Sequence, residues 1–154
     1  MDKWAWGIGG FFVLGLAFVG WQALQPAPET ASQGHSMVPP DTSKIQDGDP
    51  IVSVRLPTQL SSNAEVGKKI YEAKCVDCHG ANAAGQNGVA PPLVHKIYEP
   101  SHHSDASFIM AAERGVRAHH WKFGDMPPVP GLTQADVKMV TTYVRELQRE
   151  NGIN

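Results

Sequence analysis

Both cysteines of this 154-residue chain lie in one five-residue run, Cys75-Val76-Asp77-Cys78-His79. On a turn of helix, two thiols three residues apart can reach the two vinyl groups along one edge of a haem and form thioethers. The next residue, His79, then sits under the iron and can serve as its proximal ligand. The residue types and their spacing therefore predict covalent attachment of one haem c.

A bare C-x-x-C pair also occurs as a redox-active dithiol or as half of a zinc site. A zinc site would need a second Cys/His pair, and the chain has no further cysteine. A thioredoxin-like dithiol would need a βαβ setting, whereas the flanks of this run carry helical signals. Haem attachment is the favoured interpretation, and a coincidental pair of buried cysteines is the plainest alternative.

The first helix expected beside the motif covers residues 64–74. Ser62 or Asn63 can cap its start. Val66 and Ile70, four residues apart, give it an apolar face. This helix delivers the chain directly into the first cysteine of the motif.

Loops rich in glycine and proline separate that helix from two more, over 105–114 and 133–150. Ser104 is the expected cap of the second helix and Gly115 its stop. A capping box starts the third helix, whose apolar line consists of Val137, Val140, Val144 and Leu147. The expected fold class is all-α: a small domain of three main helices over residues 62–154.

Residues 1–25 are expected to form a transmembrane anchor. The segment from Trp4 to Leu24 carries no charge. As a helix rising about 1.5 Å per residue, it matches the roughly 30 Å hydrocarbon core of a bilayer. Tryptophans near both ends look like interfacial aromatic belts. The alternative is a cleaved signal peptide, although the apolar run is longer than an ordinary h-region and no clean cleavage site follows.

Residues 26–61 are interpreted as a Pro-rich tether. Lys3 precedes the anchor and the next basic residue, Lys44, lies far beyond it, which weakly favours a location outside the cytoplasm for the rest of the chain. Inside the tether, the alternation within 51–56 indicates a short strand or an extended arm. This piece either lies against the helical domain or is merely linker.

The composition of the chain argues against one class of function, nucleic-acid binding. The net charge is −2 and the lysines and arginines are scattered, so nucleic-acid binding is not indicated. A domain of about ninety residues has only a modest core of its own. The haem is therefore expected to supply the missing apolar mass, and the form without haem to be largely unfolded.

From about residue 62 to its end, the chain resembles a class I c-type cytochrome. The resemblance rests on the C-x-x-C-H run, the helix-crossing residues Gly67, Tyr71 and Tyr143, the segment Pro91-Pro92-Leu93, and Met126 in a Pro-rich loop before the last helix. It implies that the first and last helices cross closely, with the glycine admitting the aromatic ring. It also implies assembly on the export side of the membrane, in a periplasm.

The resemblance further implies the haem ligands. A proline carbonyl, assigned to Pro92, is expected to fix the ring of His79, and Met126 to be the distal ligand. With both axial positions filled, no site remains for oxygen or a substrate, which suits electron transfer. Met110 is interpreted as core packing and Met139 as half-exposed.

Two histidine pairs, His102-His103 and His119-His120, depart from the plain family pattern. They can be solvated loop residues that hydrogen-bond a haem propionate. They can also build a surface copper or zinc site from both pairs, or His119 or His120 can replace the distal methionine. Adjacent histidines usually point apart, so neither pair alone is a good chelate. Trp121 and Phe123 beside the second pair are expected to pack over the haem edge.

The leading functional hypothesis is a membrane-tethered electron carrier and not an enzyme. It would serve respiratory or photosynthetic complexes such as a quinol-oxidising complex and a terminal oxidase, from the periplasmic side of the inner membrane, with no nucleic acid or small-molecule substrate. A fixed haem subunit of a larger membrane oxidoreductase is the first alternative. A metal-handling or sensor protein that uses the paired histidines is the second.

Overall fold

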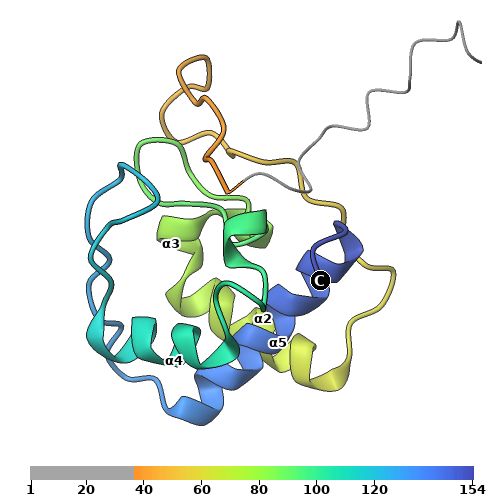
Figure 1. Ribbon diagram of the computed structural model, residues 1–154. Helices are drawn as coiled ribbons and strands as arrows, with labels where there is room; N and C mark the ends of the chain where they lie inside the picture. The colour runs from red at the N-terminus through yellow and green to blue at the C-terminus, as the bar shows by residue number, and fades with distance from the viewer. Residues whose placement is uncertain (1–36) are drawn as a thin grey trace, which may run out of the picture. The chain divides into compact units, whose positions relative to one another are not determined.

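The computed structural model describes residues 37–154. The anchor expected over residues 1–25 lies outside them, and within 37–154 no helix is both long and apolar enough to cross a membrane. The described chain is helical, with two isolated bridges and no strand (Figure 1). In chain order its elements are α2 (Ser62–Lys74), α3 (Val76–His79), the 3₁₀ turns η1 (Ala81–Ala83) and η2 (Lys96–Tyr98), α4 (Asp105–Arg114) and α5 (Gln134–Glu150). The all-α expectation is confirmed.

Local side-chain chemistry sets where the long helices begin. The hydroxyl of Ser61 accepts a hydrogen bond from the Ala64 amide at 3.3 Å, so the cap of α2 lies one residue before the predicted one. At α5, Thr133 and Asp136 form the predicted capping box: the Asp136 amide donates to the Thr133 hydroxyl, and the Asp136 carboxylate accepts from the Thr133 amide. The box fixes the first turn of α5 immediately after the Pro-rich loop.

The domain core forms where α2 and α5 cross (Figure 1). A Cβ atom added to Gly67 would lie only 1.9 Å from the carbonyl oxygen of Met139. The rings of Tyr71 and Tyr143 pack nearby, with centroids 5.6 Å apart and planes inclined by 57°. Gly67 therefore admits the backbone of α5, which corrects the expectation that it admits the aromatic ring.

The apolar line of α5 is confirmed, whereas of the two residues expected on the apolar face of α2 only Ile70 packs against the core. All four aliphatic residues of the α5 line are buried. On α2 the buried residues are Ala64, Gly67 and Tyr71, while Val66 is 49% exposed. The backbone of α5 approaches α2 most closely at Gly67, and Val66 lies on the exposed side of the helix.

Part of the segment interpreted as tether lies against the domain. Ile51 and Val52 are buried, and both their amides donate to the carbonyl of Ala84. Further along, the backbone of Arg55 exchanges two hydrogen bonds with the side-chain amide of Asn151, both 2.9 Å. Residues 45–56 thus form a docked arm rather than a strand or free linker, and the packed unit begins ahead of the expected boundary at residue 62.

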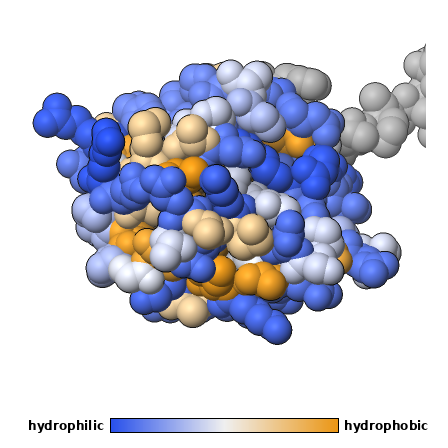
Figure 2. Space-filling model, turned by 90° about the horizontal axis from the view of Figure 1, so that it is seen from below, coloured by the Kyte–Doolittle hydropathy of each residue, from blue (hydrophilic) through white to orange (hydrophobic). Residues whose placement is uncertain are grey.

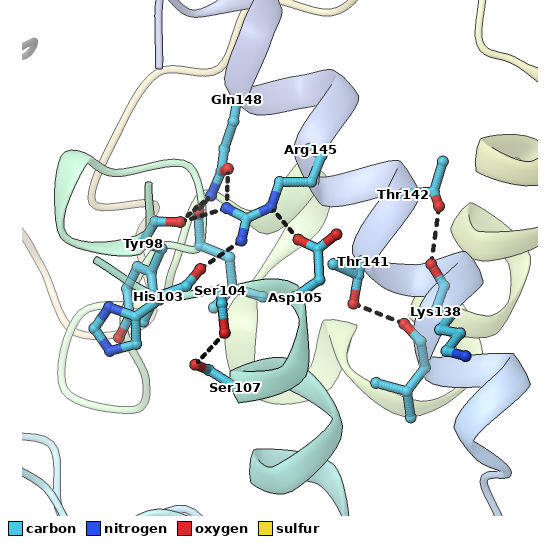
Figure 3. A network of polar contacts seen from close by, with 12 residues as sticks. Tyr98, His103, Ser104, Asp105, Ser107, Lys138, Thr141, Thr142, Arg145 and Gln148 are labelled. Atoms are coloured by element: carbon cyan, nitrogen blue, oxygen red, sulfur yellow. Dashed lines mark hydrogen bonds and ion pairs between the residues drawn. The ribbon is translucent and has the colours of Figure 1, made fainter. Parts of the chain in front are cut away.

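Arg145 on α5 joins this helix to the segment over 98–105, about forty residues earlier in the sequence (Figure 3). Its side chain is buried. The guanidinium donates to the Asp105 carboxylate at 2.8 Å, to the Tyr98 carbonyl and the Gln148 side chain at 2.6 Å each, and to the carbonyl of His103. The planar, multiply donating guanidinium suits this geometry. Arg145 therefore fixes the loop that carries the first histidine pair, together with the start of α4, to α5.

A buried histidine makes stability depend on pH. The His95 ring caps η2 by accepting from the Ile97 amide at 3.2 Å, and burial lowers the pKa of His95 below its ordinary value. The unfolded chain therefore takes up this proton at a higher pH than the folded one. The resulting stability is fully present above about pH 6.5 and falls as pH drops below it.

We expect the free energy of unfolding of the haem-loaded protein, measured in guanidinium chloride, to be lower at pH 5.5 than at pH 7.5. One such group contributes at most about 1.4 kcal/mol per pH unit. Other histidines act in the same direction, so His95→Asn isolates this one: its amide oxygen can still accept from Ile97 but cannot titrate. An unchanged pH dependence in His95→Asn would contradict the assignment.

Candidate haem site

An apolar cavity of about 410 Å³ lies between α3, α4, the loop over 115–132 and the start of α5. Its size is in the range of cofactor pockets. Cys75, Cys78 and His79 line it from one element and Met126 lines it from the loop. The structure thus brings both thiols and both predicted iron ligands to the same cavity, although they come from segments about fifty residues apart.

The His79 ring is held in one orientation. It is buried, and its Nδ1 lies 2.9 Å from the carbonyl oxygen of Pro91. A carbonyl can only accept, so Nδ1 carries the proton and Nε2 keeps the lone pair that a metal needs. This orientation leaves Nε2 available to coordinate a metal ion.

The proline partner is Pro91 and not Pro92, which corrects the assignment by one residue. Pro92 is fully buried and is not part of the cavity lining. Pro92 instead packs closely against Gly85, where an added Cβ would lie 2.5 Å from the Pro92 nitrogen. The sequence carries two adjacent prolines, and nothing in their order tells which carbonyl faces the imidazole.

The environment of the Cys75 thiol does not favour the rival uses of a C-x-x-C pair. Burial, with a smaller effect of Cys78, raises the pKa of the Cys75 thiol to about 11. The thiol form therefore dominates at neutral pH, whereas dithiol exchange and zinc binding use the thiolate. Neither cysteine belongs to a group of three potential metal ligands within the described residues.

The methionine loop is attached firmly to the end of α4. Val116 and Met126 exchange two backbone hydrogen bonds, both 2.9 Å. Gly115 turns the chain with φ +75°, and a Cβ there would lie 2.4 Å from the Met126 carbonyl oxygen. Met110 was expected in the core, but it is 48% exposed and lines the cavity instead.

One buried polar atom tests whether a haem fits this cavity. Trp121 lines the cavity, and its Nε1 is buried without a hydrogen-bond partner within residues 37–154. Burial raises the pKa of Tyr98, and a weak interaction of its hydroxyl with the Trp121 indole lowers it slightly. The hydroxyl and the indole N–H do not reach hydrogen-bond geometry. An orphaned donor at the wall of an apolar cavity suits a haem propionate. This donor was missed in the sequence, where Trp121 was read as packing alone.

The cavity mouth is apolar. Val89 and Met110, which line the cavity, are 43% and 48% exposed. Phe108 also lines it and packs under the guanidinium of Arg145, 5.0 Å from its ring centroid. Figure 2 shows that apolar residues gather in patches on one face of the domain, between hydrophilic ones.

The two histidine pairs meet in space. The rings of His102 and His120 have centroids 5.1 Å apart, and those of His103 and His119 lie at 6.0 Å. His103, His119 and His120 also line the haem cavity. Burial, and then the neighbouring histidines, hold the pKa of His120 below its ordinary value; for His103, burial is likewise the largest cause. Neither the meeting of the pairs nor the role of Arg145 beneath them could be read from spacing along the chain.

Comparison with known proteins agrees with this geometry. The sequence profile of the cytochrome c family matches residues 64–148, more than half of the chain. The chain is also 36% identical, over 94 residues, to the "Cbb3-type cytochrome c oxidase subunit FixP" of Bradyrhizobium sp. (strain ORS 278). The aligned region covers 60% of this chain and 30% of that relative, so the chain spans under a third of the relative's length.

Proposed function

Since the chain belongs to the cytochrome c family, we propose that it passes single electrons between membrane complexes through one covalently bound haem c. The observation that carries the proposal is the cavity shared by Cys75, Cys78, His79 and Met126. When bound, the haem supplies an iron that gains and loses one electron. The residues of the chain itself attach the haem, orient it and supply the ligands of its iron.

Those residues would act in three ways. Cys75 and Cys78 hold the group by thioethers, so that it cannot dissociate during repeated turnover. The Nδ1–H of His79 donates to Pro91, which fixes the ring and strengthens the donor character of Nε2. Met126, which lines the same cavity, would supply a thioether ligand, and such a ligand favours the reduced iron and raises the reduction potential. With both positions filled, the chain by itself offers no coordination site for a reaction, so we propose a carrier and not an enzyme.

Two arrangements of that carrier differ in their partners. In the first, residues 1–25 anchor the chain in the inner membrane, residues before the docked arm form a tether, and the haem domain moves between complexes on the periplasmic side. In the second, the domain is a fixed subunit of a larger oxidoreductase, as the Bradyrhizobium relative is named a subunit of a cytochrome c oxidase. Purification in mild detergent distinguishes them, because a fixed subunit co-purifies with its partners in constant proportion.

The ligand assignment is tested by Met126→Ala in the full-length, haem-loaded protein. We expect the native ferric protein to show the weak absorption band near the red end that reports sulfur–iron ligation, and the variant to lose it. Its reduction potential is expected to fall, since the soft ligand is gone. Optical titration against redox mediators measures both quantities.

Met110→Ala is the matched control because Met110 also lines the cavity. It is expected to keep the band and shift the potential little. A band that persists in Met126→Ala would contradict the assignment, and a histidine ligand such as His119 or His120 would then be the candidate.

A further inference from the structure

Three imidazoles from two loops converge beside the haem cavity. One ring nitrogen each of His102, His103 and His120 lies within 4.8 Å of the other two. The Nε2 atoms of His102 and His120 face each other at 3.1 Å. Among the described residues this is the one group of three potential metal-ligating side chains.

The spacing of the His102–His120 pair is close to what a metal ion requires, and the His103 nitrogen, within 4.8 Å of both, would have to move toward the ion. For a tetrahedral ion with metal–nitrogen bonds of about 2.0–2.1 Å, two ligand nitrogens lie about 3.3–3.4 Å apart. The pair at 3.1 Å needs to open by only a few tenths of an ångström. In the metal-free state the two nitrogens share one hydrogen, and an ion would take its place.

The surroundings orient the third ring in the way that metal sites use. His103 Nδ1 donates to the carbonyl of Ile97 at 2.6 Å, so its Nε2 carries the lone pair. A ligating histidine commonly gives its other N–H to a backbone carbonyl in this manner. The amides of His102 and His103 both donate to the Glu99 carbonyl, and Arg145 holds the His103 carbonyl (Figure 3).

We propose that His102, His103 and His120 bind one divalent transition-metal ion at the edge of the haem cavity. Three neutral imidazoles suit copper, nickel and zinc rather than magnesium or calcium, and the ordering of first-row metals places Cu²⁺ above Zn²⁺. No carboxylate or thiolate belongs to the group. His119 packs on His120 with ring centroids 4.4 Å apart, but it lies outside the ligand set.

The test uses full-length haem-loaded protein in detergent, purified without a polyhistidine tag and stripped with a chelator. Titration with ZnCl₂ and with CuCl₂ alone, followed by calorimetry, is expected to show one ion per chain, with Cu²⁺ bound more tightly. The electron paramagnetic resonance spectrum of the Cu²⁺ form is expected to show nitrogen ligands. His102 is exposed, so His102→Gln should fold normally and weaken binding about ten-fold or more.

His119→Gln is the matched control, with the same substitution in the same cluster, and is expected to change the affinity less than about three-fold. His120→Gln should behave like His102→Gln. Retention of the haem spectrum in each variant shows that the domain is intact. Absence of stoichiometric binding by the native protein, as when a propionate occupies the histidines, overturns the proposal. So does a His102→Gln variant that binds like the native protein, or an equal loss in His119→Gln.

Discussion

Replacing both Cys75 and Cys78 by serine is expected to abolish covalent haem attachment and to leave the domain without cooperative folding. The reason is the distribution of the core. The described residues of α5 include eight buried ones, but α4 has only Ala112. The loop over 115–132 has none. These segments surround the cavity, and without the haem they have little to pack against.

The size of the effect follows from the cavity. An apolar void costs about 24 cal/mol per Å³. Kept dry and empty, 410 Å³ would therefore cost about 10 kcal/mol as an upper bound, which rivals the entire stability of about 5–15 kcal/mol of an ordinary domain. The structure must collapse or admit water instead.

Circular dichroism during urea titration measures this, with haem staining on a denaturing gel to confirm the loss of attachment. The single variant Cys78→Ser, which keeps one thioether, is the control and is expected to retain a cooperative transition. A cooperative, native-like transition in the haem-free double variant would show that the protein core suffices by itself.

Gly67→Ala is expected to destabilise the haem-loaded protein by about 3 kcal/mol or more, the upper end of the usual range for overpacking. The added methyl group would lie 1.9 Å from the Met139 carbonyl oxygen. The obstacle is helix backbone and not a side chain that can rotate, so α2 and α5 must separate along their crossing.

The sign of this effect is diagnostic. In an unobstructed helix interior, glycine to alanine stabilises by about 0.5–1 kcal/mol. Guanidinium unfolding of the haem-loaded protein measures the change. Val66→Ala, one residue earlier on the exposed side of α2, is the control and should shift the midpoint little. Stabilisation by Gly67→Ala would mean that the helices do not touch here.

The sequence predicted the parts of this domain that depend on neighbours along the chain. The capping box of α5, the end of α4 at Gly115 and the α5 line are local in origin, because hydrogen bonds and helical periodicity set them within a few residues. The haem motif is local too. These features carried the fold class and the family resemblance.

The features that the sequence did not predict correctly depend on tertiary contacts. Val66 matched a helical apolar pattern, but the close approach of α5 selects the small face of α2. Met110 was expected to pack in the protein core because of its position within a helix. It lines the haem cavity instead. Which of two adjacent prolines meets His79, and whether two histidine pairs meet at all, are decided by loop geometry that no periodicity records.

If the haem domain is tethered to the membrane as proposed, the docked arm would limit how far it can travel. As a flexible chain, a leash over residues 26–61 would span on average about 30–36 Å, whereas one that ends at the arm, over about 19 residues from 26 to 44, spans about 22–26 Å. In the proposed tethered arrangement, the two hydrogen bonds between Arg55 and Asn151 and the burial of Ile51 and Val52 would therefore shorten the distance over which the haem domain can reach its partners. A shorter tether would raise the local concentration of the domain near partners close to the proposed anchor and exclude distant ones. Releasing the arm from the domain would let the haem domain reach more distant partners but would make its encounters with nearby partners less frequent.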